Sequence, residues 1–140
     1  MNQKGNDALI ELLLAKIEQQ AQPKSALAYL RARRYIEEHY LTLHTVQEVA
    51  VACNVNRMYL SRLFRRFACT GAYQFITGLK MERAAEMLSD GGLTVKQVAE
   101  KLAFADPFHF SRVFKRVHGI PPELYVRRHR RGQGRGAHGE

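Results

Sequence analysis

Two stretches of the 140-residue chain carry the same combination of serine, arginine and large apolar residues. Ser61 and Arg62 recur fifty positions later as Ser111 and Arg112. A guanidinium group can bond bidentately to O6 and N7 of guanine, a contact that discriminates between bases by about 1–3 kcal/mol. We therefore predict that Arg62 and Arg112 contact bases of DNA, with the short and versatile serines beside them.

Other side chains of these two stretches suit other parts of a duplex. Met58 and Phe108 offer apolar surface to thymine methyl groups, and His109 is a further candidate for base contact. The cations around them are predicted to hold phosphates, and these are Arg57, Arg65, Arg66, Lys115 and Arg116. Alternatives without a role in binding stay open. The cations could form a solvated helix face, and His109 could be a packing residue. Met58 and Phe108 could belong to a minor hydrophobic cluster or simply be exposed.

The charge balance favours a polyanionic partner. The chain has 22 Lys and Arg against 13 Asp and Glu, a net charge of +9. Acidic and basic side chains cancel in residues 1–26, so the excess lies in residues 27–140. Nucleic acid is therefore the first partner to consider. Arginines and glycines dominate residues 128–140, which we predict to be a flexible basic tail that touches phosphates, with a solvated terminus without a role as the alternative.

Other classes of function find little support. Cys53 and Cys69 cannot make a disulfide framework or a four-thiolate zinc site, and the histidines show no metal-ligand spacing, so we predict neither metal nor cofactor. Cys53 is expected to be a buried structural thiol. Glu82 and Glu86 flank Arg83 and indicate a solvated face, so no catalytic residue is predicted. No apolar run approaches the roughly 20 residues that span a bilayer, which leaves a reduced, cytoplasmic compartment as the expectation.

Helices must position these residues. Prolines occur only at 23, 107, 121 and 122, and no segment alternates with period two, so we predict an all-α fold of about seven helices plus a leader helix. The leader helix is expected from about Asp7 to Gln20 within residues 1–26, and the next helix from an N-cap at Ser25. Capping boxes begin at Thr45 and Thr94.

An internal repeat organises residues 27–127. Each copy has a short capped helix, a tight turn and a longer basic amphipathic helix, which is the helix-turn-helix plan. We place the copies at about 46–67 and 95–118, with a connecting helix at about 72–88 that ends before Gly91 and Gly92. Small Ala50 and Ala99 allow the paired helices to approach. The apolar residues expected to face inward on the two longer helices are Leu60, Leu63, Phe64, Phe67, Phe110, Val113, Phe114 and Val117.

Residues 108–125, FHFSRVFKRVHGIPPELY, resemble the C-terminal signature of the AraC/XylS family of transcriptional regulators, and residues 55–67 are similar to its partner motif. The likeness covers about residues 30–127. It implies two helix-turn-helix subdomains, joined by a rigid helix, that enter successive major grooves on one face of double-stranded DNA. It also implies a sequence-specific regulator at promoter or operator sites, nucleoid-associated in the cytoplasm and not an enzyme, with RNA polymerase as a partner if it activates.

The chain departs from the family pattern in three places. Ala103 and Cys69 stand where the family usually has glycine, so a left-handed turn at Ala103 is expected to be strained or differently shaped. Residues 1–26 cannot form an effector-binding or dimerisation domain, so the chain is either a short regulator or the C-terminal piece of a longer one. We expect a monomer on an asymmetric site of about two helical turns.

Two other classes of function remain as alternatives. One is a helical interaction module or a nucleic-acid binder indifferent to sequence. The other is a DNA-repair alkyltransferase, which needs a cysteine-rich zinc site that two scattered cysteines do not supply.

Overall fold

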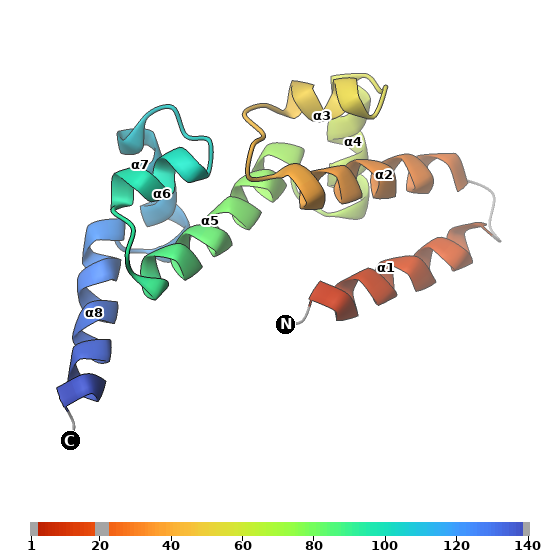
Figure 1. Ribbon diagram of the computed structural model, residues 1–140. Coiled ribbons are helices and arrows are strands. Elements are labelled where there is room, and N and C mark those ends of the chain that lie inside the picture. Colours follow the sequence, from red (N-terminus) through yellow and green to blue (C-terminus); the bar gives the residue numbers. More distant parts are fainter. Residues whose placement is uncertain (1–2, 19–22, 139–140) are drawn as a thin grey trace. The chain divides into compact units, whose positions relative to one another are not determined.

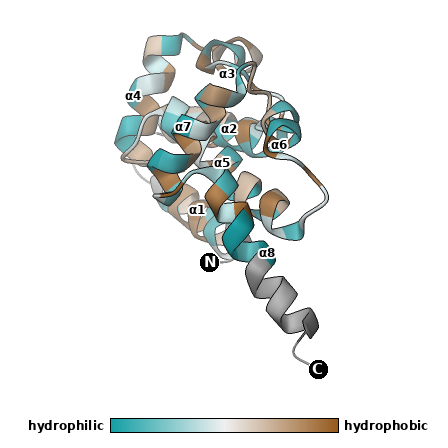
Figure 2. Ribbon diagram, turned by 90° about the vertical axis from the view of Figure 1, so that its left-hand side faces the viewer, coloured by the Kyte–Doolittle hydropathy of each residue, from teal (hydrophilic) through white to brown (hydrophobic). Residues whose placement is uncertain are grey.

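The computed structural model describes residues 3–18 and 23–138, where all regular structure is α-helical, as predicted (Figure 1). The helices are α1 (Gln3–Glu18), α2 (Pro23–His39), α3 (Val46–Ala52), α4 (Arg57–Phe67), α5 (Ala72–Asp90), α6 (Val95–Lys101), α7 (Pro107–His118) and α8 (Pro122–His138). Hydrophilic and hydrophobic residues interleave along them, as amphipathic helices require (Figure 2).

The chain forms two compact units, each with one helix-turn-helix pair. Unit 1 comprises Met1–His39 and Thr45–Phe75, and it contains α3 and α4. Unit 2 comprises Tyr40–His44 and Ile76–Glu140, and it contains α6 and α7. Helix α5 begins in unit 1 and continues into unit 2.

An aromatic cluster forms the core of unit 1. Phe64 of α4 is fully buried, with its ring centroid 5.1 Å from that of Tyr29 and 5.4 Å from that of Phe75. Tyr29 also stacks on Phe67 at 5.2 Å. Edge-on and offset pairs of this kind stabilise beyond the apolar area that they bury. They fix α4 against α2.

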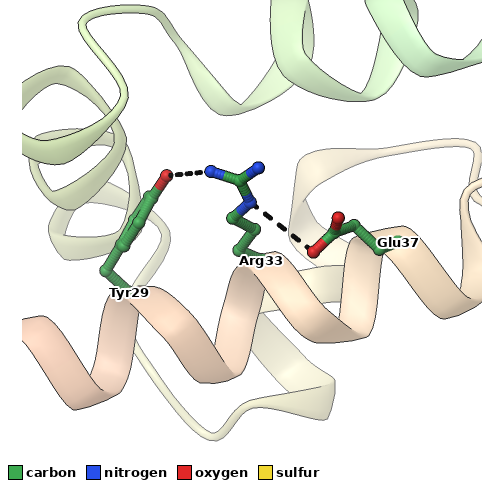
Figure 3. A network of polar contacts seen from close by, with 3 residues as sticks. All are labelled: Tyr29, Arg33 and Glu37. Carbon is green, nitrogen blue, oxygen red and sulfur yellow. Dashed lines mark hydrogen bonds and ion pairs between the residues drawn. The ribbon is translucent and has the colours of Figure 1, made fainter. Parts of the chain in front are cut away.

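Arg33 of α2 is built into this core. Its Nη1 donates to the Tyr29 hydroxyl at 3.3 Å, and its Nε lies 3.5 Å from Oε1 of Glu37 (Figure 3). The guanidinium also lies 5.2 Å from the centroid of the Phe75 ring. These contacts occupy the cation within unit 1, so Arg33 contributes to the fold.

Unit 2 has a core of its own. Phe110 and Phe114 are fully buried in a cluster with residues of α5, α6 and α8. The Nε2 atom of His118 lies 2.9 Å from the Met81 carbonyl oxygen, and the Tyr125 hydroxyl lies 3.1 Å from Oγ of Ser89. These two contacts tie α7 and α8 to α5.

The predicted caps and turns are present. Both capping boxes form, at Thr45 and at Thr94. Each helix-turn-helix turn has one residue with positive φ after its first helix, Asn54 (56°) and Ala103 (63°). In the second turn the N–H of Phe104 donates to the Ala99 carbonyl at 2.9 Å, which closes a Schellman-type turn. Asparagine tolerates this conformation, but alanine is strained in it, as expected.

We predict that Ala103→Gly raises the free energy of unfolding by about 0.5–1 kcal/mol. Glycine relieves a left-handed strain of roughly 1–2 kcal/mol and adds a smaller entropy to the unfolded chain. Urea unfolding measures the change. Ala105→Gly is the control, because Ala105 has no positive φ and should lose stability. A loss in both variants would contradict strain at Ala103.

Several helix ends differ from the prediction. Helix α1 begins at Gln3, and α2 begins at Pro23 rather than after Ser25, because proline is compatible with the first turn of a helix. The connecting helix continues to Asp90. Residues 128–138, predicted as a flexible tail, are helical in α8. Arginine is a good helix former, and no proline follows Pro122, so a helix begun there can propagate. Residues 19–20 and 139–140 lie outside the described residues.

The prediction that Val117 faces inward is wrong, since 50% of it is exposed. Its counterpart Phe67 is half-buried because Tyr29 of α2 covers it. Helical spacing gives the direction of a side chain, but it does not tell how far along the helix the covering elements extend. In α7 the cover reaches His118 but leaves half of Val117 exposed.

Candidate nucleic-acid interface

Helix α4 is held so that one face points to solvent. Its N-cap Asn56 accepts a hydrogen bond from the Met58 N–H at 2.7 Å, which fixes the first turn. Leu60, Leu63 and Phe64 are buried, as predicted. The opposite face carries the residues predicted to meet DNA.

Helix α7 repeats this arrangement. Asp106 caps it by accepting a hydrogen bond from the Phe108 N–H at 2.9 Å, and Pro107 occupies the first turn. Phe110, Val113 and Phe114 are buried, as predicted. The capped start and buried stripe give both longer helices the same register.

Each helix exposes a large apolar side chain next to an arginine. Met58 is 73% exposed and Phe108 is 74% exposed, at positions fifty residues apart, so neither belongs to the core. Arg62 and Arg112 follow one turn later and are also exposed. The two helices thus expose the same pair of side-chain types, one large and apolar and one cationic, at matching positions. Among the other predicted base contacts, the half-buried ones are Ser61, His109 and Ser111.

The residues predicted to hold phosphates are all exposed, and they are Arg57, Arg65, Arg66, Lys115 and Arg116. The first three lie on α4 in unit 1, and Lys115 and Arg116 lie on α7 in unit 2. We call α4 and α7 the recognition helices. Arg127, Arg128 and Arg130 add exposed charge on α8. Guanidinium groups on a helix surface are suited to phosphate oxygens through charge-assisted hydrogen bonds.

The cysteines lie outside this surface chemistry. Cys53 is buried as predicted, and burial raises the pKa of its thiol, with Arg31 opposing the rise. Cys69 is exposed and has φ of 58°. Across residues 3–18 and 23–138, no three His, Cys, Asp or Glu side chains are grouped so that they could hold a metal ion.

Comparison with known proteins decides the family. A helix-turn-helix domain family matches residues 49–128. The C-terminal domain of AraT, a response regulator from Geobacillus stearothermophilus, is 33% identical, superposes with a TM-score of 0.68, and is covered over 84% of its length by 71% of this chain. The chain belongs to the AraC/XylS family of transcriptional regulators. This is a family of helix-turn-helix regulators and not of enzymes.

Longer relatives fit this assignment. The raffinose operon regulatory protein RafR of Pediococcus pentosaceus is 33% identical over 73% of this chain, and the HTH-type regulator YisR of Bacillus subtilis is 28% identical over 84%. The chain spans 37% and 42% of the lengths of these two relatives. The DNA-binding domain of AdpA, solved with a target DNA, shares the fold at 21% identity and a TM-score of 0.69, with 76% of this chain covering 96% of it.

None of the described helices combines the length and the apolar composition that a membrane-spanning helix requires.

Proposed function

We propose that the chain is a sequence-specific transcription regulator that places α4 and α7 in successive major grooves of double-stranded DNA. The observation that carries the proposal is the matched pair of exposed faces, with Met58 and Arg62 on one helix and Phe108 and Arg112 on the other. A helix fits the major groove, where guanine and thymine present distinct edges. Family membership supports the same reading.

Each side chain has a defined role in this proposal. Arg62 and Arg112 bond to guanine, while Met58 and Phe108 contact thymine methyl groups. Ser61, Ser111 and His109 approach other base edges, and the remaining cations of α4 and α7 hold phosphates and set the register of each helix.

Selection of bound duplexes from a random pool, followed by sequencing, tests the proposal. The expected result is an enriched asymmetric site with two half-sites whose centres are roughly 10–10.5 base pairs apart. Binding without an enriched sequence would point instead to a nucleic-acid binder indifferent to sequence, which the net charge of +9 would also serve.

The cellular setting follows from the same proposal. With two recognition helices in one chain, a monomer can fill both half-sites. Promoter or operator DNA in the cytoplasm, associated with the nucleoid, is the natural place of action. An activating member of this kind would also contact RNA polymerase.

The arginines of α8 are proposed to contact phosphates without reading bases. Replacing Arg128 and Arg130 by glutamine should weaken binding to all duplexes alike and make the dependence of log K on log salt shallower by up to about 0.9 per lost contact. Binding isotherms at several salt concentrations measure this slope. The control replaces Arg31 and Arg34, exposed on α2, in the same way and should leave the slope unchanged. A changed sequence preference in the α8 variant would show that α8 reads a groove.

A further inference from the structure

The second recognition helix has an aromatic neighbour that the first lacks. The ring centroid of His109, in the first turn of α7, lies 5.6 Å from that of Phe104, in the turn between α6 and α7. His109 is half-buried, whereas Phe108 and Arg112 on either side of it along the helix are exposed. The imidazole therefore packs against the Phe104 ring at an interplanar angle of 55°, at the edge of the exposed surface of α7.

Phe104 is itself fixed from several directions. Its ring meets the fully buried ring of Phe110 edge-on, with centroids 5.3 Å apart. Its backbone N–H donates to the Ala99 carbonyl oxygen. The Nζ atom of Lys80 lies 5.3 Å from its ring centroid, where a cation is attracted by the ring quadrupole. Together these contacts hold the ring of Phe104 in one orientation.

Lys80 has an equally defined place. Among the residues that the structure describes, Lys80 is the one charged residue that is buried, with 5% of its surface exposed. Its ammonium group donates a hydrogen bond to the Leu43 carbonyl oxygen. A buried ammonium group is costly unless it is hydrogen-bonded, so this contact determines where the cation sits. Lys80 thereby supports Phe104 from the side of α5.

The first repeat has no equivalent arrangement. Its residues at the corresponding positions are Val55 and Tyr59, so an aliphatic side chain stands where the second repeat has the ring of Phe104. Both turns have a positive-φ residue followed by an N–H that donates to the carbonyl five positions back. The second turn also holds one more residue before its helix begins, so the repeats differ at this point in turn length and in side chains.

We propose that Phe104, supported by Lys80, is a positioning residue that orients His109 toward a base edge and so gives the second half-site a selectivity that the first lacks. The inference rests on the proposed function, because it needs α7 in a major groove. Each ring nitrogen of an imidazole forms hydrogen bonds in the ring plane, in a direction set by the orientation of the ring. A ring held in one orientation therefore points these nitrogens at a defined place on a base edge, whereas a freely turning ring can reach several places.

A double-mutant cycle tests this proposal on the site selected from the random pool. His109→Ala, Phe104→Leu and the double variant are compared on that site and on duplexes with one half-site scrambled. His109→Ala should reduce discrimination at the second half-site by about three- to tenfold. Phe104→Leu should cause a similar loss, and the double variant should lose no more than His109→Ala alone. Discrimination at the first half-site serves as the internal control and should not change.

Lys80 provides a second measurement. Lys80→Met should cause part of the same loss, and Lys80→Arg should restore discrimination, since a guanidinium group can also donate to a carbonyl and stack on a ring. Thermal unfolding of every variant is recorded. If Phe104→Leu does not fold, the cycle is run with Lys80→Met and His109→Ala.

The outcomes separate this inference from the proposed function. A wild-type chain that selects no sequence overturns both. A wild-type chain that selects a site, with Phe104→Leu affecting both half-sites equally or adding to His109→Ala, overturns only the positioning role. Val55→Ala, the matched change in the first repeat, should leave the second half-site unaffected.

Discussion

Arg62→Ala and Arg112→Ala are each expected to cost about 1–3 kcal/mol of binding free energy on the selected site and much less on random DNA. The losses should fall in different half-sites, because each arginine lies on its own recognition helix, in its own unit. The two positions share no partner, so their penalties should add. Binding isotherms on the selected site and on half-site-scrambled duplexes measure both effects.

The arginine variants also need a test of folding and a matched control. Both side chains are exposed, so neither change should alter the free energy of unfolding by more than about 0.5 kcal/mol. Arg34→Ala, an exposed arginine on α2, should leave base preference unchanged. The two-groove arrangement would be wrong if both substitutions affected the same base pairs, or if either one unfolded the protein without changing specificity.

Phe64→Ala is expected to lower the free energy of unfolding by about 3–5 kcal/mol. Phe64 has no exposed surface and contacts the rings of Tyr29 and Phe75, so its removal leaves a cavity among residues held by α2 and α5. Domains of this size have a total stability of about 5–15 kcal/mol, so the variant should lose a large share of it. Urea titration followed by circular dichroism measures the loss.

Met58→Ala is the matched control for Phe64→Ala. It removes a large apolar side chain from the same helix, but 73% of Met58 is exposed, so the change in stability should stay within about 0.5 kcal/mol. Met58→Ala should instead affect DNA binding, because it is expected to weaken binding to the selected site. Equal destabilisation by both variants would mean that Met58 is packed in solution.

The local features could be predicted from sequence because their determinants lie within a few residues. The capping boxes at Thr45 and Thr94 need a hydroxyl group and a side-chain acceptor three positions later. The repeat then aligns the two recognition helices. Arg62 and Arg112 could thus be assigned to exposed faces by spacing alone, opposite the apolar stripe.

The long-range features could not be predicted in this way. Lys80 meets a carbonyl group 37 residues away, and a lysine on an amphipathic helix gives no signal that it will be buried. Val117 has the spacing of a core residue, but no element covers enough of it. The composition of residues 128–138 predicts no regular structure, yet α8 begins at Pro122 and continues through them as a helix. Such outcomes depend on what packs nearby.

The unequal side chains of the two repeats give the bound chain a direction. Phe104, Phe108 and His109 of the second copy correspond to Val55, Met58 and Tyr59 of the first, and the second turn is one residue longer. A twofold-symmetric dimer on a palindrome looks the same from upstream and downstream. A monomer bound in the proposed way, with two different recognition helices, does not. Inverting its site in front of a gene would then turn the whole molecule end for end and present a different unit to the proteins that start transcription.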